Sequence, residues 1–288
     1  MLRDILRTTF YSIRNYIPTP IYLKLMYWRI SGKALNIKNP KTYAEKLAYL
    51  KVYKTQGDLS RYVDKYRVRD YVKGKIGEKY LIPLIGVYEN EEEIPWESLP
   101  SEYVLKCNHD TGSVVIKHTQ DNLDREATKL HFKKALKTNL YWAGREYPYK
   151  SVVPSIICEK LLDDGSGEIK DYKILCFDGE PKYIVCDVGR FSNHRRNIYD
   201  LEWRNQGITT DHQQYDGYIE KPEKLDEMIV LAKKLSKGFI HVRVDFYFVN
   251  GKIYFGEMTF FPWAGNIWFT PDEWNYKLGE LISLKEKE

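Results

Sequence analysis

Two acidic residues, Asp245 and Glu257, lie in the strand-like stretch VDFYFVNGKIYFGEMTF at residues 244–260. The alternation of apolar and polar residues predicts a hairpin with one apolar face and one face that holds both acids. A two-residue Asn250-Gly251 loop would pair Asp245 with Gly256 and bury Glu257. We therefore predict a three-residue loop, 249–251, with Gly251 left-handed in a bulge. This loop pairs Arg243 with Glu257 and sets Asp245 diagonal to Glu257, roughly 7–8 Å away.

Two carboxylates held this close on one face of a hairpin repel each other unless a cation lies between them. Oxygen ligands of this kind suit magnesium, so Asp245 and Glu257 are candidate Mg²⁺ ligands. The alternative interpretation is that Arg243 neutralises both acids in a surface salt bridge. We favour the metal, because other parts of the chain carry matching chemistry.

The composition is that of a globular protein of 288 residues, with 43% hydrophobic and 15% aromatic residues. The net charge of +5 is small for this length, and the basic bias lies in residues 1–50, where nine basic residues face only Asp4 and Glu45. Residues 1–30 could form a basic amphipathic helix on anionic lipid, which would give peripheral membrane association, although a helix docked on the protein is favoured. We expect no nucleic-acid partner, since only this local charge supports one.

Four cysteines lie in strand-like stretches without a metal-binding spacing, and we predict that they are buried free thiols. This pattern is typical of a reducing compartment. The amino-terminal apolar residues are interrupted too often for a signal peptide or a membrane span. We therefore expect a cytoplasmic protein.

The predicted elements form an α+β protein in three regions. Helices dominate residues 1–78, where Thr42-x-x-Glu45 is a capping box. Strands at 81–88, 103–108 and 113–118 and a helix at 122–140 form a region at 79–153. The third region, 154–288, contains the strand IICEKLL, a hairpin that turns at Asp178-Gly179, a helix at 222–237, the acidic hairpin and a last helix after Pro271.

Several segments, taken in chain order, resemble the ATP-grasp superfamily over roughly residues 60–270. They are DKYRVRDYV with Lys65, VLKCNHDTGS with Lys106, IICEKLL with Glu159 and Lys160, and the acidic hairpin. Three longer segments are similar to the TupA-like branch: NPKTYAEKL, LIPLIGVY and RVDFYFVNGKIYFGEMTFFP. The resemblance implies two antiparallel-sheet lobes with ATP between them, and a role in bacterial surface-polysaccharide or teichuronopeptide biosynthesis, which takes place in the cytoplasm or at the inner face of the membrane.

The resemblance also implies roles for individual residues. Arg243 and Lys106 would be catalytic, with Arg243 steadying the transferring phosphate, and Thr259 would stand where many relatives have Asn as a further metal ligand. The implied ATP-binding residues are Lys65 and Lys106 for the phosphates, Thr111, Gly112 and Ser113 in a covering turn, Glu159, Lys160 and Leu162 for adenine, and Asp171 and Lys173 near the ribose or substrate.

Basic residues in GRFSNHRRNIYD are candidates for recognition of an acidic substrate, because bidentate donors suit carboxylates and phosphates. A charge run is, however, usually a solvated face. Trp142 and Arg145 could similarly clamp a sugar. The candidate substrate residues are Arg190, His194, Arg195, Arg196 and Asn197.

The predicted activity is an ADP-forming carboxylate–amine ligase that uses ATP and Mg²⁺. It would act through an acyl phosphate and join an amino acid to a uronic acid or related unit. The partners would be a small-molecule or glycan substrate with a carboxylate, and an amine donor. A sugar kinase and a nucleotide-sugar glycosyltransferase remain as alternatives.

Overall fold

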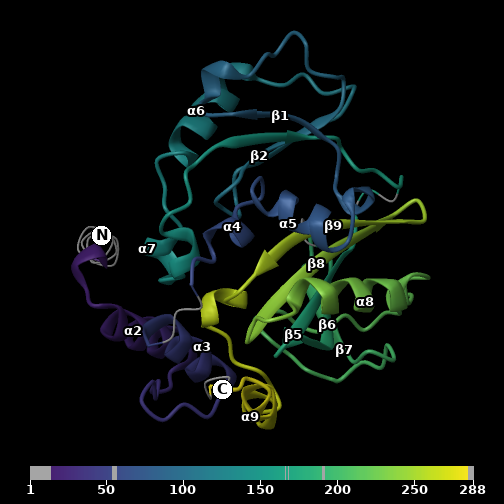
Figure 1. The fold of residues 1–288 in the computed structure, drawn as a ribbon. Helices are drawn as coiled ribbons and strands as arrows, with labels where there is room; N and C mark the ends of the chain where they lie inside the picture. Colours follow the sequence, from purple (N-terminus) through teal and green to yellow (C-terminus); the bar gives the residue numbers. More distant parts are fainter. Residues whose placement is uncertain (1–13, 54–56, 166, 168, 190–191, 285–288) are drawn as a thin grey trace.

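The computed structural model describes residues 14–53, 57–165, 167, 169–189 and 192–284. Two antiparallel sheets form the framework, and Figure 1 shows α4 and α5 lying between them. The predicted α+β class and two-sheet arrangement are confirmed. The smaller sheet has the order β1-β4-β2-β3 and consists of β1 (Leu84–Tyr88), β4 (Ile156–Glu159), β2 (Tyr103–Cys107) and β3 (Val114–Lys117). The larger sheet has the order β7-β6-β5-β8-β9 and consists of β7 (Arg195–Tyr199), β6 (Glu180–Val188), β5 (Asp171–Phe177), β8 (His241–Val249) and β9 (Lys252–Thr259).

Helices cover the sheets and form the amino-terminal region. The predicted capping box opens α3: the Thr42 hydroxyl accepts from the Glu45 N–H, and the Glu45 carboxylate accepts from the Thr42 N–H. The α-helices are α2 (Thr19–Ser31), α3 (Tyr43–Val52), α4 (Ser60–Val63), α5 (Val68–Lys75), α6 (Arg125–Ala135), α7 (Tyr141–Gly144), α8 (Leu225–Ser236) and α9 (Glu273–Glu280). The 3₁₀ turns are η1 (Arg14–Tyr16), η2 (Glu78–Tyr80), η3 (Glu91–Glu93), η4 (Tyr147–Tyr149) and η5 (Pro262–Gly265).

The smaller sheet packs one face against α6. Leu105 and Cys107 of β2, Ile156 of β4 and Phe132 of α6 are all fully buried in this core. The predicted boundary at residues 153 and 154 assigns β4 to the larger lobe, but β4 pairs with both β1 and β2. The boundary is wrong because β4 is apolar on both faces, so its sequence does not show which sheet buries it.

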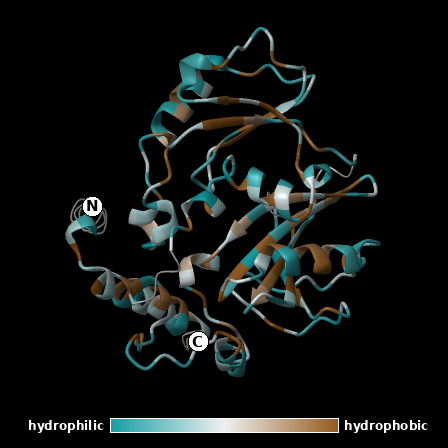
Figure 2. Cartoon of the chain, viewed as in Figure 1, coloured by the Kyte–Doolittle hydropathy of each residue, from teal (hydrophilic) through white to brown (hydrophobic). Residues whose placement is uncertain are grey.

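The larger sheet buries one face under α8, whose Met228, Leu231 and Leu235 belong to the main core. Hydrophobic residues run along the strands of both sheets in Figure 2. The predicted turn at Asp178-Gly179 is confirmed, since both residues have positive φ and join β5 to β6. The opposite face of the sheet, which carries Asp245 and Lys173, points toward the smaller lobe.

The hairpin β8–β9 shows that the predicted loop is wrong. Val249 pairs with Lys252, so the turn has only two residues, Asn250 and Gly251, both with positive φ. The register shifts instead inside β9, at Gly256, and this bulge puts Glu257 directly opposite Asp245. The acids therefore share a face, as predicted, but by direct pairing.

Residues 1–13, the first part of the amphipathic helix predicted at 1–30, lie outside the described residues. Among the residues that are described, no helix is both long and apolar enough to cross a membrane. All four cysteines are buried and free, as predicted.

Candidate active site

The acidic pair forms a buried cluster with Arg243. One guanidinium edge donates to both Asp245 carboxylate oxygens at 2.7 Å, and the same Arg243 Nη2 donates to Glu257 Oε1 at 2.8 Å. The Thr259 hydroxyl donates to Glu257 Oε1 at 2.9 Å. Arg243 faces Thr259 across the strands, not Glu257 as predicted, because the bulge lies at Gly256. Arg243 does form the salt bridges of the alternative interpretation, but they are not on the surface, since Asp245 is only 4% exposed.

The pKa values of the two carboxylates shift in opposite directions. Burial raises the pKa of Asp245 to about 6, although Arg243 opposes this effect. For Glu257, burial alone would raise the pKa, but Arg243 and then Lys65 lower it to about 2. One arginine thus compensates two acids incompletely, and a divalent cation would relieve the remaining repulsion.

The donor set suits magnesium that arrives with a polyphosphate. Two carboxylates and a hydroxyl, from Asp245, Glu257 and Thr259, supply only oxygen atoms. Within the described residues, no group of three His, Cys, Asp or Glu side chains could hold a metal by itself. Mg²⁺ is commonly held by one or two carboxylates together with waters and substrate phosphates, so this incomplete set fits that binding mode.

Lys65 connects the two sheets at this point. Its N–H donates to Asn108 O at 3.0 Å, just after β2, and its ammonium group donates to Asp110 O in the same turn. Burial lowers the pKa of Lys65, the charge of Glu257 raises it, and the charge of Lys106 lowers it again. Lys65 therefore lies between a cation of the smaller sheet and an acid of the larger one. The predicted helix breaks here into α4 and α5, so Lys65 is a turn residue.

Lys106 lies on the inner face of the smaller sheet and is paired. Its ammonium group is 2.6 Å from Glu159 Oε2, and Arg69 of α5 binds Glu159 Oε1 at 3.0 Å. Glu159 is thus held by two cations, which does not support its predicted contact with an amine or ribose group. The sequence did not indicate Arg69, because nothing in the helical segment VRDYVKGK marks one arginine as inward-facing.

The inner face around Lys106 is apolar. Val114 of β3 is opposite Lys106, and Ile116 is opposite Val104, so these side chains share one face of the sheet. Both residues lie on the edge strand β3, and Val114 and Ile116 are 49% and 42% exposed. Ile157 of β4 pairs with Lys106 on its other side but is fully buried, so the accessible aliphatic surface lies on β3. An aliphatic face beside a lysine could receive the flat side of a nucleobase.

The residues predicted to bind adenine, Lys160 and Leu162, follow the end of β4. Lys160 is exposed, and its N–H donates to Pro83 O at 2.9 Å, so this donor is already used within the protein. Leu162 is partly buried and follows the end of β4. Any adenine recognition on this edge would depend on the apolar face more than on the Lys160 N–H.

The turn after β2 divides the residues predicted to cover phosphates. Ser113 is buried, its hydroxyl donates to Asp110 Oδ1 at 2.6 Å, and it accepts from the Cys107 N–H at 3.0 Å. This hydroxyl stabilises the turn and is not available for a phosphate, which corrects its predicted role. Thr111 and Gly112 are exposed at the tip, where a Cβ on Gly112 would meet no atom within 4 Å.

A second charged cluster continues the same face of the larger sheet. Lys173 lies opposite Asp245 across β5 and β8, and its ammonium group binds Asp171 at 3.0 Å and Asp187 at 2.6 Å. Arg196 Nε binds Asp187 at 2.6 Å from β7. Although burial would raise it, Lys173 and Arg196 hold the pKa of Asp187 well below its usual range. Asp187 was missed because one acid in the strand KYIVCDV gives no signal of function.

The predicted substrate residues do not gather at one place. Arg195–Tyr199 form the edge strand β7 and not a loop, so successive side chains point to opposite faces. Arg196 faces the acidic cluster, and His194 Nε2 is 3.0 Å from Asp187 Oδ1. Arg195 and Asn197 belong to the other face, which contradicts a shared role. Arg190 lies outside the described residues.

Glu146, which the sequence did not mark, is a buried carboxylate next to the acidic cluster. It is 6% exposed, and in the described part of the chain no hydrogen bond or ion pair is made to its side chain. Burial raises the pKa of Glu146 to about 7, while the charges of Lys51 and Arg243 oppose the shift and that of Glu257 adds to it. Glu146 therefore lies close enough to the catalytic candidates for their charges to affect its ionisation.

The neighbouring residue Arg145 has a structural role, not the predicted sugar contact. It is 2% exposed and donates to the Ile17 carbonyl at 3.1 Å. Its guanidinium also lies over the rings of Tyr22 and Trp142, at 4.6 and 4.9 Å from their centroids. These contacts join α7 to the start of α2.

Two antiparallel sheets, with Lys106 on one, a carboxylate pair on the other and Lys65 in the turn between them, define an ATP-grasp arrangement. The family model for TupA-like ATP-grasp proteins matches residues 45–283, and the chain belongs to this family. ATP-dependent ligation is accordingly the broad class of its activity.

Solved structures with a similar fold include ATP-grasp ligases. D-alanine–D-alanine ligase from Bacillus anthracis, complexed with ATP, has 17% identity and a TM-score of 0.43, over 78% of this chain and 67% of that one. The ATP-grasp ligase PsnB, in complex with a phosphomimetic precursor variant, Mg and ADP, has 13% identity and a TM-score of 0.41, over 98% and 70%. The Helicobacter pylori D-alanine–D-alanine ligase has 12% identity and a TM-score of 0.39, over 77% and 61%. No curated protein is significantly similar to the sequence.

Proposed function

We propose that the protein is an ADP-forming carboxylate–amine ligase, which joins an amino acid to a uronic acid or a related unit of a bacterial surface polysaccharide. The observation that carries this proposal is the position of Lys65, whose charge is coupled both to Lys106 on the smaller sheet and to Glu257 on the larger one. Two lysines facing a carboxylate suit a polyphosphate between the two lobes, because the lysines can bind its oxygens and the carboxylate can bind its divalent ion.

Separate residues would bind the metal, the phosphates and the phosphoryl group in transfer. Asp245, Glu257 and Thr259 would hold Mg²⁺, and Lys65 and Lys106 would bind phosphate oxygens. Bound Mg·ATP would supply the phosphoryl group for activation of a carboxylate. Arg243, at the centre of the acidic cluster, would stabilise negative charge on the phosphoryl group in transfer.

Glu146 would recognise the amine. The nearby charge of Lys51 does not prevent burial from raising the pKa of Glu146, so the ionised carboxylate is costly unless a further cation occupies its surroundings in the working state. An ammonium substrate would be such a cation, and Glu146 could then take its proton as the amine attacks the acyl phosphate. Replacement by glutamine should raise the KM for the amine and leave the Kd for ATP unchanged.

The pathway and place of action rest on the family. TupA-like ATP-grasp membership supports surface-polysaccharide biosynthesis, and we propose action in the cytoplasm, at or near the inner face of the membrane. The basic residues of the first 50 positions would favour an anionic lipid surface.

The test is product analysis with ATP, Mg²⁺, glucuronic or galacturonic acid and a panel of amino acids. We expect ADP and inorganic phosphate that depend on both substrates, and a hydroxamate when hydroxylamine replaces the amine. The variant Asp245→Asn should abolish these products. Asp226→Asn, whose side chain is 90% exposed on α8, should not. A phosphomonoester product would indicate a sugar kinase, and glycosyl transfer without ATP consumption would indicate a glycosyltransferase.

A further inference from the structure

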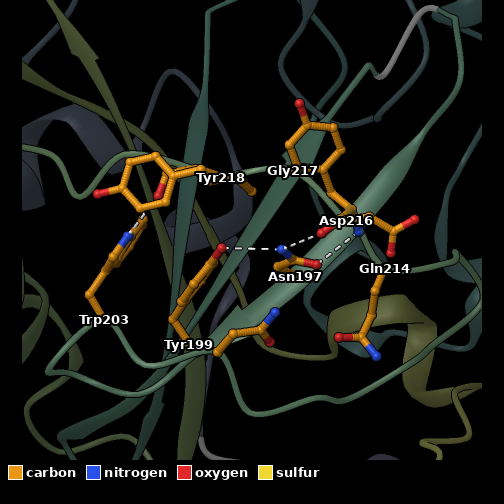
Figure 3. A pocket seen from close by; sticks show the side chains of 10 residues that line it. Asn197, Tyr199, Trp203, Gln214, Asp216, Gly217 and Tyr218 are labelled. Atoms are coloured by element: carbon orange, nitrogen blue, oxygen red, sulfur yellow. Dashed lines mark hydrogen bonds between the residues drawn. The ribbon is translucent and has the colours of Figure 1, made fainter.

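A cavity lies on the larger lobe, away from the acidic cluster. Its volume is about 460 Å³, within the usual range for small-molecule sites. It forms between β7 and the segment that returns along it, residues 203–219 (Figure 3). Neither the family match nor the proposed ligase chemistry assigns a role to it.

The strand geometry places this cavity on the face of the sheet opposite the ATP-binding candidates. Arg196 reaches Asp187 on the face of the acidic cluster, so its neighbour Asn197 points to the other face. Three strand spacings separate β7 from β8, or about 14 Å. A small ligand in the cavity would therefore not touch the residues proposed to bind magnesium.

Aromatic rings and amides dominate the cavity wall. Tyr199 and Trp203 stack with ring centroids 4.3 Å apart and an interplanar angle of 4°. Tyr218 is 84% exposed, an unusual state for a large aromatic residue beside a cavity. The amide side chains of Asn205 and Gln214 supply both donors and acceptors at the rim.

Asn197 fixes this wall in place. Its amide nitrogen donates to the Tyr199 hydroxyl and to the Tyr215 carbonyl, each at 3.1 Å, and its oxygen accepts from the Tyr215 N–H at 3.0 Å (Figure 3). Asn197 is 1% exposed, so its groups hold the returning segment against β7. Gly217 then lets the Tyr215 ring lie close, because a Cβ on Gly217 would be 2.5 Å from that ring. Hydrogen bonds within the protein therefore hold the Tyr199 and Tyr215 part of the aromatic wall in place.

The charge of the lining selects among ligands. Among the described residues that line the cavity, Asp216 has the only charged side chain. A nucleotide, a phosphate or a uronic acid would meet no cation there and would be repelled by Asp216. A neutral sugar ring presents apolar C–H faces to aromatic rings, and its hydroxyls donate to carboxylates and bond with amides.

We propose that this cavity binds a neutral sugar unit of a glycan. The site is separate from the ATP site and does not require ligase activity. In combination with the proposed function, it would hold one unit of an extended acceptor while another unit reaches the acidic cluster on the opposite face.

The experiment is saturation-transfer NMR and calorimetry on the full chain without ATP. The probes are the methyl glycosides of glucose, galactose, mannose and N-acetylglucosamine, with glucuronic acid and AMP as charged comparators. We expect at least one neutral glycoside to bind with a Kd of about 1 mM or below, and the charged comparators to bind at least tenfold more weakly.

Three variants locate the binding. Tyr218→Ala should weaken the neutral glycoside at least tenfold, while Tyr16→Ala, whose side chain is equally exposed at 87%, should have no effect. Gly217→Ala should also weaken it, because the Tyr215 ring must move. All three should keep the parent's thermal shift with Mg·ATP. The proposal is overturned if no neutral glycoside binds, if glucuronic acid or AMP binds better, or if Tyr218→Ala binds as the parent does.

Discussion

Replacement of Glu146 by glutamine should stabilise the protein, and increasingly so as the pH rises. Burial raises the pKa of Glu146 from its ordinary value of 4.5 to about 7, so the folded state keeps a proton that the unfolded state has lost. Below pH 4.5 the carboxyl is protonated in both states and costs nothing. Between pH 4.5 and 7 the unfolded state ionises first, and the free energy of unfolding of the parent falls. Above pH 7 the penalty is complete and constant.

The size of this penalty follows from the shift of the pKa. A difference of about 2.5 pH units corresponds to about 3 kcal/mol at full ionisation. The variant also removes the attraction between Glu146 and Lys51, which remains charged below a pKa of about 8. We therefore expect the advantage of the variant over the parent to grow from near zero at pH 4.5 to roughly 1–3 kcal/mol at pH 7.5.

The assay is urea unfolding of both proteins at pH 5, 6, 7 and 8, with the difference in free energy of unfolding taken at each pH. Titrating groups that do not interact with Glu146 contribute equally to both proteins and cancel, whereas the coupled Lys51 reduces the difference. Glu223→Gln, at an exposed position, is the matched control and should give a flat difference. A flat or falling difference for Glu146→Gln would refute the reasoning, because it would mean that this carboxylate is stabilised in its charged form.

Three further variants test the other assignments. Asp245→Asn should lose Mg²⁺-dependent ATP binding by calorimetry, and retention of the parent's Kd would remove the metal assignment. Lys106→Met should raise the Kd for ATP at least tenfold, or about 1.4 kcal/mol, whereas an unchanged Kd would mean that Lys106 only neutralises Glu159. Ser113→Ala should lower the free energy of unfolding by about 1–3 kcal/mol and leave ATP binding unchanged, because it strands the buried Cys107 N–H. Weaker ATP binding by a fully stable Ser113→Ala protein would restore the phosphate role.

The sequence was informative where local chemistry decides the structure. The capping box at Thr42 and the Asp178-Gly179 turn appear as predicted, because each is set by residues a few positions apart. The acidic face of the β8–β9 hairpin was also predictable, since alternation follows the pleat. These local rules place Asp245 and Glu257 on one face without any knowledge of the rest of the chain.

Partners from distant parts of the chain could not be predicted. The buried carboxylate of Glu146 has the Coulombic influence of Lys51, about a hundred positions earlier, and Arg243, about a hundred later. The Lys106–Glu159 pair likewise depends on β4 joining the smaller sheet, which its apolar sequence does not reveal. Ion pairs of this kind are formed by tertiary packing, and one sequence carries no trace of it in spacing or composition.

The bulge at Gly256 lies between these two cases, since two local rules together would have located it. Asn250-Gly251 is the sequence of a two-residue turn with positive φ at both positions, and the structure has that turn. With this turn, a regular ladder would pair Asp245 with Gly256 and send Glu257 into the core. Because a lone carboxylate is costly there, one extra residue must enter β9 between the turn and Glu257. Gly256 is the one glycine within that strand, and its buried neighbours confirm the change of phase: Phe255 faces the core before it and Met258 after it.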